Sequence, residues 1–267
     1  MSRSIYEEIT RDWSEEKREQ FPSSAFQFHS SVGSTNTLLR ENLESGEADH
    51  FSLVVADHQT AGRGRRGDRW EASEGSNLLF SLALQLPDSP RNWSRLPHLT
   101  AMVVGMSIES ILTESPQVEA KWPNDLMAQS RKLCGILVET ITTPSPFAIV
   151  GVGINVNMRG AEFPTELADI ATSLYEMEGC EANRWFLLGL ILESFLENFP
   201  DRLTDFESVL AWYRNRDFLA GKSIEVLTVT DSLKGVAKGL GADGELIVET
   251  PEKGEVAIVS AEKIVVC

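Results

Sequence analysis

The chain has 267 residues, of which 24 are lysine or arginine and 40 are aspartate or glutamate, giving a formal net charge of −16. This excess of negative charge disfavours general nucleic-acid binding, because binding to a polyanion depends on basic side chains that neutralise phosphates. Hydrophobic residues make up 42%, as in globular domains, and the absence of a membrane-length apolar run or a signal-peptide-like start leads us to expect a cytoplasmic protein that does not enter a membrane.

The first part of the chain is predicted to form a sheet flanked by helices. Its helices begin with polar residues and carry apolar residues at helical spacing, whereas its strands are short apolar runs rich in β-branched residues. These patterns predict, in chain order, one exposed helix within 5–21, a helix over 34–46, strands over 51–57 and 77–84, a helix over 96–112, and strands over 118–121, 132–140 and 147–156.

The second part of the chain changes its pattern twice. From residue 183 to about residue 218 the apolar spacing is helical, with Pro200 as a break, which predicts packing helices. After Gly221 come short alternating runs separated by glycine-containing turns, at 223–227, 235–240, 245–249 and 256–259. Strands with this spacing predict a small β-barrel of about fifty residues.

Residues 62–70, Gly-Arg-Gly-Arg-Arg-Gly-Asp-Arg-Trp, form a basic segment in this acidic chain, which we call the arginine loop. Glycines allow the backbone to approach a ligand closely, and guanidinium groups present paired donors that match phosphate or carboxylate oxygens. An anionic ligand is therefore one interpretation. The other is a solvated turn whose arginines pair with surface carboxylates at small net gain.

Lys121 ends a short apolar segment just before Trp122 and Pro123. A lysine directed into a cleft from a buried strand needs an anionic partner to offset its desolvation, and a carboxylate or an α-phosphate would serve. Asn124 and Asp125 are turn-forming residue types, which is the simpler role for at least one of them.

The run Gly151-Val152-Gly153-Ile154-Asn155 contains half of a dinucleotide-binding fingerprint. It lacks the third glycine and the following helix, so a Rossmann interpretation is poor. We expect instead that the small residues let a ligand ring lie against the strand.

Five motifs together resemble the biotin protein ligases, and the resemblance extends from Phe26 to Asn157. The motifs are Ser34-Thr35-Asn36, the run from Gln59 to Gly67, Lys121 to Leu126, Arg131 to Glu139, and Gly151 to Asn155. The resemblance implies an α+β fold with a mixed sheet flanked by helices as the catalytic domain, residues 1–219. A small SH3-like β-barrel would form the C-terminal domain, residues 220–267.

The resemblance also implies a reaction in two steps. Biotin and MgATP would form biotinyl-5′-adenylate and pyrophosphate, and a lysine amine of a biotin carboxyl carrier protein, or of a carboxylase carrier domain, would then attack the mixed anhydride. The magnesium ion would be held chiefly by ATP phosphates, so no metal site built from protein side chains is expected.

Residue roles follow by the same resemblance. The side chains that would contact the ureido group of biotin are Ser34, Thr35, Asn36 and Gln59. Arg63, Gly64 and Arg65 would close over biotin and the adenylate phosphate, becoming ordered when the adenylate binds. Lys121 would hold the biotin carboxylate near the α-phosphate, so Lys121 and Arg65 are the expected catalytic residues. Asn155 would contact adenine, and Lys132 is a lower-ranked phosphate neighbour.

Two features depart from the family or from some of its members. Family members often carry a basic residue where this chain has Asp68, which we expect to face solvent or to pair with Arg66 or Arg69. Some relatives also act as repressors through an N-terminal winged helix-turn-helix. The segment before Ser34 is short and acidic, so we expect a ligase without repressor function, either a monomer or a homodimer.

Two rival functions stay open at the level of sequence. A lipoate or octanoate ligase or transferase would share the fold, although Gln59 and the Ser-Thr-Asn turn favour a polar head group. A non-catalytic adenylate-binding sensor would use Arg65 and Lys121 without transfer. Cys134 could carry an acyl group in such a transferase, but its apolar setting predicts a packed thiol, and the odd count of cysteines without CxxC spacing indicates neither disulfides nor zinc.

Overall fold

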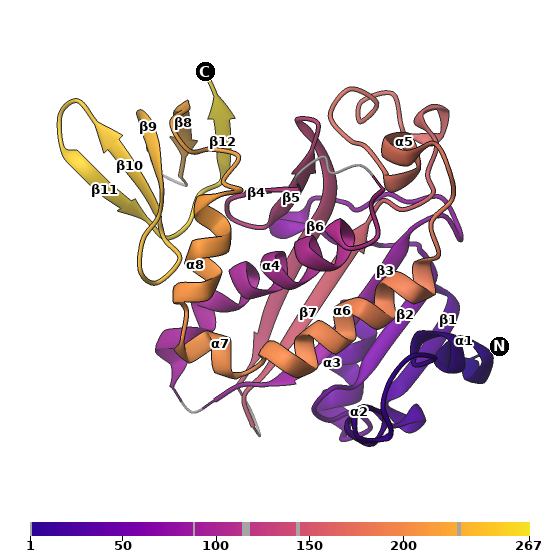
Figure 1. Cartoon of the computed structure of the whole chain (residues 1–267). Helices are drawn as coiled ribbons and strands as arrows, with labels where there is room; N and C mark the ends of the chain where they lie inside the picture. The colour runs from indigo at the N-terminus through magenta and orange to yellow at the C-terminus, as the bar shows by residue number, and fades with distance from the viewer. Residues whose placement is uncertain (1, 88, 114–117, 143–144, 229–230) are drawn as a thin grey trace.

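The computed structural model describes the chain except for residues 1, 88, 114–117, 143–144 and 229–230. A seven-stranded sheet forms its centre, with strand order β1-β2-β3-β7-β6-β5-β4 (Figure 1). The strands are β1 (Phe26–Val32), β2 (Leu53–Gln59), β3 (Leu78–Gln85), β4 (Glu119–Lys121), β5 (Asp125–Ala128), β6 (Arg131–Ile141) and β7 (Phe147–Ile154). Only β1 and β2 pair in parallel among the described strands, so the sheet is mixed, as expected.

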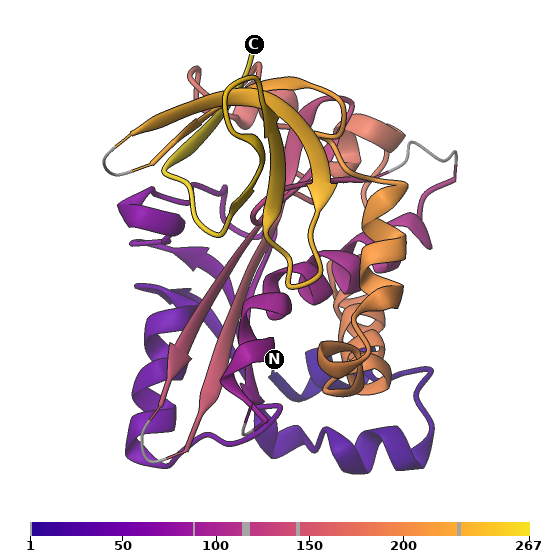
Figure 2. The same ribbon diagram turned by 90° about the vertical axis from the view of Figure 1, so that its left-hand side faces the viewer.

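Helices cover both faces of this sheet. They are α1 (Ser2–Ile9), α2 (Glu15–Gln20), α3 (Thr35–Ser45), α4 (Leu96–Glu109), α5 (Leu174–Glu178), α6 (Arg184–Asn198), α7 (Asp201–Thr204) and α8 (Glu207–Arg214). One face is covered by α3, whose Leu39 packs with Val54, Ala83 and Ile149. The opposite face carries α4 and α6 in the main hydrophobic cluster (Figure 2).

The crossover helix α3 forms as the sequence predicted. Ser34 occupies the N-cap position and Gly46 ends the helix in the left-handed conformation, with φ of 79°. A parallel pair such as β1 and β2 requires a crossover connection, which α3 supplies. Its N-terminus therefore lies at the end of β1, where Thr35 and Asn36 are buried.

The N-terminal segment corrects the prediction of one exposed helix within 5–21. Two helices form, separated by a turn in which Ser14 caps α2 by accepting a hydrogen bond from Lys17 N. Four apolar side chains of the segment are buried: Ile5, Ile9, Trp13 and Phe21. They join the main cluster, so the segment packs on the large sheet and its helices, as expected, whereas the outer faces of α1 and α2 stay exposed.

A second, antiparallel sheet follows, with strand order β11-β10-β9-β8-β12. Its strands are β8 (Ser223–Leu227), β9 (Ser232–Leu240), β10 (Leu246–Thr250), β11 (Gly254–Ile258) and β12 (Lys263–Val266). The first four were predicted, and β12 was missed. Within the described residues the terminal strands β11 and β12 do not pair with each other, so the SH3-like unit is an open five-stranded sheet.

The two sheets are joined through side chains of the first. Trp122 and Met127 belong to the hydrophobic cluster of the second sheet, together with Phe218 and Leu219. Trp122 also donates a hydrogen bond from its indole Nε1 to Gly244 O at 3.0 Å.

In the part of the chain that the structure describes, no helix has the length and apolar character needed to cross a membrane. The boundary at 219/220 stays a prediction.

Candidate active site

A cavity of about 300 Å³ lies at the junction of the two sheets. Its walls are the start of α3, the arginine loop, the β4–β5 turn, the middle of β6 and β7, and residues 261–264. Most of the site residues expected from the sequence line this one cavity: Ser34, Thr35, Asn36, Gln59, Arg63, Gly64, Arg65, Lys121 and Lys132. Asn155 is not among the lining residues.

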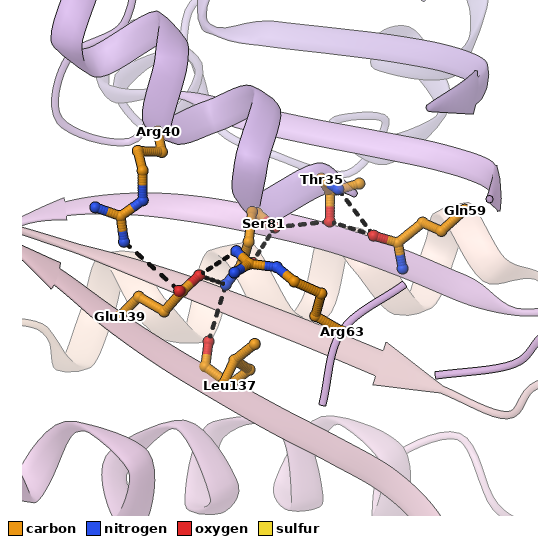
Figure 3. Close-up of polar contacts among 8 residues, drawn as sticks. Thr35, Arg40, Gln59, Arg63, Ser81, Leu137 and Glu139 are labelled. Atoms are coloured by element: carbon orange, nitrogen blue, oxygen red, sulfur yellow. Dashed lines mark hydrogen bonds and ion pairs between the residues drawn. The ribbon is translucent and has the colours of Figure 1, made fainter. Parts of the chain in front are cut away.

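A polar cluster occupies one end of the cavity (Figure 3). Gln59 Oε1 accepts hydrogen bonds from Thr35 N at 2.8 Å and from Thr35 Oγ1 at 3.2 Å. Ser81, a fully buried residue of β3, donates from Oγ to Asn36 Oδ1 at 2.5 Å and lies 2.7 Å from Thr35 Oγ1. Its role was not predicted from the sequence.

Two groups in this end have free hydrogen-bonding capacity. Ser34 sits at the N-cap without a side-chain capping bond, and neither its hydroxyl nor Gln59 Nε2 has a hydrogen-bond partner among the described residues. Because Gln59 Oε1 accepts the two hydrogen bonds from Thr35, the orientation of the amide is set and its Nε2 is left as a hydrogen-bond donor. A rigid, uncharged polar ligand group that needs both donors and acceptors fits this end.

Glu139 of β6 connects the polar cluster to the arginine loop (Figure 3). Its Oε2 accepts from Asn36 Nδ2 at 2.8 Å and pairs with Arg63 Nη2 at 2.9 Å, while Oε1 lies 3.6 Å from Arg40 Nη2. Asn36 fits because β7 has no side chain at Gly151, where a Cβ atom would lie 2.2 Å from Asn36 Oδ1. The sequence motifs included Glu139 but assigned it no role.

The opposite end of the cavity is cationic. Lys121 and Asp125 face each other in the β4–β5 pair, yet the Asp125 carboxylate pairs with Lys132, at 2.7 Å from Nζ. Among the described residues neither Lys121 nor Arg65 has a carboxylate within ion-pair distance.

Both free cations have a lowered pKa. Burial is the main cause for Lys121, and the charges of Lys132, Lys222 and Lys263 act in the same direction, opposed by Asp125. Burial also lowers the pKa of Arg65, followed by the neighbouring charge of Arg66. Lys121 Nζ also lies 5.6 Å from the centroid of the Phe218 ring. Half-buried cations with no carboxylate at ion-pair distance among the described residues are a site for an anion.

The arginine loop folds as a small hairpin. Gly64 N donates to Asp68 O at 2.7 Å and Trp70 N donates to Gly62 O at 3.1 Å. Asp68 is exposed, in agreement with the expectation that it faces solvent. Whether the loop is mobile without ligand stays a prediction.

Trp70, at the end of this loop, lies against the paired glycines of β6 and β7. A Cβ atom would come within 2.8 Å of the indole at Gly135 and within 2.6 Å of it at Gly153. The sequence led us to expect a ligand ring against the small residues of 151–155, of which Gly153 is one. The ring found there is the protein's own, because the hairpin returns the chain over the strands.

Comparison with known proteins agrees with this geometry. The model of the biotin/lipoate A/B protein ligase family matches residues 28–157. The bifunctional ligase/repressor BirA of Bacillus subtilis is 35% identical over 229 residues, which cover 84% of this chain and 69% of the relative. The chain belongs to the biotin protein ligase family.

Other members of the family match over more of their length. The biotin–acetyl-CoA-carboxylase ligase of Mycobacterium tuberculosis is 30% identical, with 88% of this chain and 86% of the relative covered. The biotin protein ligase from Aquifex aeolicus, solved in complex with biotin and ATP, superposes with a TM-score of 0.78 at 30% identity, covering 91% of this chain and 99% of that one. The expected absence of repressor function stays a prediction.

Several residues in the family motifs have structural roles. Asn155 is buried, donates from Nδ2 to Thr172 O at 3.0 Å and accepts from Asn77 Nδ2 at 3.4 Å. The adenine contact expected for it stays a prediction that this geometry does not favour. Asn124 lies in the β4–β5 turn and joins it to β6, because its Nδ2 donates to Ile136 O at 2.7 Å and its own carbonyl accepts from Ile136 N at 2.9 Å.

Cys134 of β6 lies in the interior of the protein. Cys134 is fully buried in the main hydrophobic cluster, as predicted for a packed thiol, and burial raises the pKa of its thiol. Within the described residues, His, Cys, Asp and Glu form no group of three that could hold a metal ion.

Proposed function

We propose that this protein activates biotin with ATP and transfers it to a lysine of a biotin carboxyl carrier protein or carrier domain. One observation carries the proposal: a single cavity is lined both by Thr35, Asn36 and Gln59 and by Arg65 and Lys121. Ser81 supports the polar group from behind, and the two cations have no carboxylate at ion-pair distance among the described residues. Biotin has the matching form, with a ureido head group at one end and a carboxylate at the other. The biotin–acetyl-CoA-carboxylase ligase of Mycobacterium tuberculosis and the biotin protein ligase from Aquifex aeolicus, which was solved with biotin and ATP, support the assignment.

In the first step a biotin carboxylate oxygen attacks the α-phosphorus of ATP. A P–O bond to the carboxylate forms, the bond from the α-phosphorus to the bridging oxygen breaks, and pyrophosphate leaves with that electron pair. Lys121 reduces the repulsion between the two anions and stabilises the charge that develops on the α-phosphoryl oxygens. Ser34 and Gln59 hold the ureido group, so the carboxylate reaches Lys121 in a defined orientation.

In the second step the carrier lysine attacks the acyl carbon of biotinyl-5′-adenylate. The C–N bond forms, the bond from the acyl carbon to the phosphate oxygen breaks, AMP leaves and the amine proton passes to water. Arg65 holds the adenylate phosphate until the carrier arrives, because a guanidinium offers paired donors to phosphate oxygens. Magnesium would enter with ATP and would be held chiefly by its phosphates.

The test is biotin-dependent exchange of pyrophosphate into ATP, followed by labelling of a carrier domain. We expect exchange with biotin and none with lipoate or octanoate, and labelling of the carrier lysine. Lys121→Ala is expected to reduce both activities at least about 100-fold, as when a transition-state charge partner is removed. Arg65→Gly should preserve adenylate formation but release the adenylate into solution.

If exchange depended on lipoate or octanoate, that acid and not biotin would be the substrate. Tight binding of the adenylate without transfer to a carrier would favour the sensor function. Normal activity of both variants would refute the residue roles. Cytoplasmic location and the choice between monomer and homodimer are further parts of the proposal. Cell fractionation and sedimentation with biotin and ATP test them.

A further inference from the structure

The C-terminal sheet contributes to the cavity through the segment that leads into its last strand, β12. Figure 1 shows this sheet beside the end of the large sheet formed by β4 and β5. Ala261, Glu262, Lys263 and Ile264 line the cavity together with the arginine loop. Segments separated by almost 200 positions in the sequence therefore meet at the site.

Arg66 is the side chain that links the two segments. Its Nε lies 3.2 Å from Glu262 Oε1, and its Nη2 donates to Ser260 Oγ at 3.2 Å. Both partners lie in the connection between β11 and β12 of the C-terminal sheet. Arg66 also has a positive φ of 57°, which is uncommon for a residue with a side chain and persists where the surrounding contacts hold it.

The arginine loop is thus held on both sides of Arg65. Arg63 pairs with Glu139 of the large sheet at 2.9 Å, and Arg66 pairs with Glu262 of the C-terminal sheet. Arg65 lies between these two anchors, half-buried and without a carboxylate partner among the described residues. Fixing both neighbours restricts where its guanidinium can point.

We propose that Glu262, assisted by Ser260, is a positioning residue that binds Arg66 and thereby keeps Arg65 over the phosphate of the acyl-adenylate. This proposal rests on the function proposed above and adds the C-terminal sheet to the machinery that retains the intermediate. Loss of the contact removes the anchor on the Arg66 side of Arg65 and leaves the Arg63–Glu139 pair and the packing of Trp70 on the large sheet, so this part of the loop opens more often and the adenylate escapes sooner.

The first experiment measures the release of preformed biotinyl-5′-adenylate from the full chain. Arg66 and Glu262 are 28% and 41% exposed, so the pair has the strength of a partly exposed ion pair. Glu262→Gln is therefore expected to speed release about twofold to fivefold. Arg66→Gln should have a similar effect, and the double variant should release no faster than either single one.

The direction of the Glu262→Gln effect separates positioning from simple charge. Removing a carboxylate near an anionic ligand strengthens its binding if only Coulomb interactions change. Faster release therefore requires loss of the Arg66 contact, whereas unchanged or slower release would overturn the proposal. The exchanged pair, Arg66→Glu with Glu262→Arg, is expected to restore slow release in part.

A second measurement does not depend on biotin chemistry. Trypsin cleaves after arginine, and Glu262→Gln keeps every arginine of the loop, so cleavage within 63–69 should be faster in this variant than in the unaltered protein. Glu252→Gln, an equal charge change in an exposed turn of the same sheet, should cleave at the unaltered rate. Equal cleavage of all three proteins would refute the contact, and failure of biotin-dependent exchange would separately refute the proposed function.

Discussion

Lys121 is a cation that has no carboxylate at ion-pair distance within the described part of the chain. Asp125 faces it across the β4–β5 pair but is bound to Lys132, and the cavity adds Lys263 on another side. Burial and these like charges lower the pKa of Lys121. An anionic substrate opposes the lowering of the pKa, because a nearby negative charge favours the protonated form of lysine. Binding and protonation of Lys121 are therefore linked.

We expect this linkage to appear in the pH profile of adenylation. As pH rises through the lowered pKa of Lys121, the free enzyme loses the charge that attracts the substrate, so kcat/KM should fall at a pH below the usual lysine value of 10.5. Lys121→Arg keeps the charge to much higher pH and should move this alkaline limb upward, although kcat falls. Exchange rates measured from neutral to alkaline pH test this prediction. If kcat/KM fell at the same pH in Lys121→Arg and in the unaltered protein, a group other than Lys121 would cause the fall.

Single site residues were predicted from sequence where they belong to a short motif with a direct chemical reason. Thr35, Gln59 and Lys121 were found in this way, and the structure places them in one cavity. Ser81 was missed because its partners lie 45 and 46 positions away. The available signal was a lone hydroxyl in the otherwise apolar strand β3, since a buried hydroxyl needs a hydrogen-bond partner.

At the scale of elements, close packing of α3 on β7 positions the polar end of the cavity. Gly151 is the residue of β7 that makes room for Asn36, with 2.2 Å between an added Cβ and Asn36 Oδ1. Gly151→Ala must therefore displace Asn36 from Ser81 and Glu139. We expect the KM for biotin to rise at least about tenfold, by loss of buried hydrogen bonds, and the KM for ATP to change less.

Gly33→Ala is the matched control for this substitution, because a Cβ there meets no atom within 4 Å. It should leave both KM values within about twofold, as an unstrained change of this kind does. Steady-state exchange kinetics at varied biotin and ATP give the comparison. Equal effects of the two substitutions would show that Asn36 does not depend on Gly151.

Elements with a strong pattern were predicted, and weakly patterned ones were not. The strands β3, β6 and β7 are long and apolar, and α4 is buried on nearly all sides. In contrast, β1 mixes Phe with polar residues at the sheet edge, and β5 spans only Asp125–Ala128, directly after residues that indicate a turn. Such strands are fixed by pairing with neighbours, which a single sequence does not display.

At the scale of the whole molecule, the relation between the two sheets was the part that sequence could not supply. The change of pattern after Gly221 predicted a separate β unit, but not that Trp122 would enter its hydrophobic cluster. Nor did it indicate that Arg66 would reach Glu262. These contacts join residues about 120 and 200 positions apart and depend on how two finished surfaces fit.

His98 lies where the two parts of the molecule meet. It is a buried residue of α4, its Nδ1 is 3.2 Å from the Tyr213 hydroxyl of α8, and its ring packs so tightly on the β9–β10 turn that a Cβ at Gly244 would lie 2.5 Å from Cδ2. Burial lowers the pKa of His98 from 6.5 to about 4, opposed by a hydrogen bond with the Gly244 backbone. The folded protein therefore holds this imidazole neutral.

The sign of the resulting pH effect follows from linkage. Below pH 6.5 the unfolded chain takes up a proton at His98, whereas the folded chain resists that proton down to about pH 4. Acidification through this range therefore favours unfolding. The contribution of neutral His98 to the free energy of unfolding is complete only above pH 6.5. Between pH 7 and pH 5 this one group should lower the free energy of unfolding by about 2 kcal/mol. His98→Gln removes the titration, so its free energy of unfolding, measured in urea at both pH values, should fall less than that of the unaltered protein by this amount. Carboxylates change the free energy of unfolding equally in His98→Gln and in the unaltered protein, so they cancel when the two changes with pH are compared. If the free energy of unfolding fell equally in both proteins, His98 would already accept a proton in the folded state.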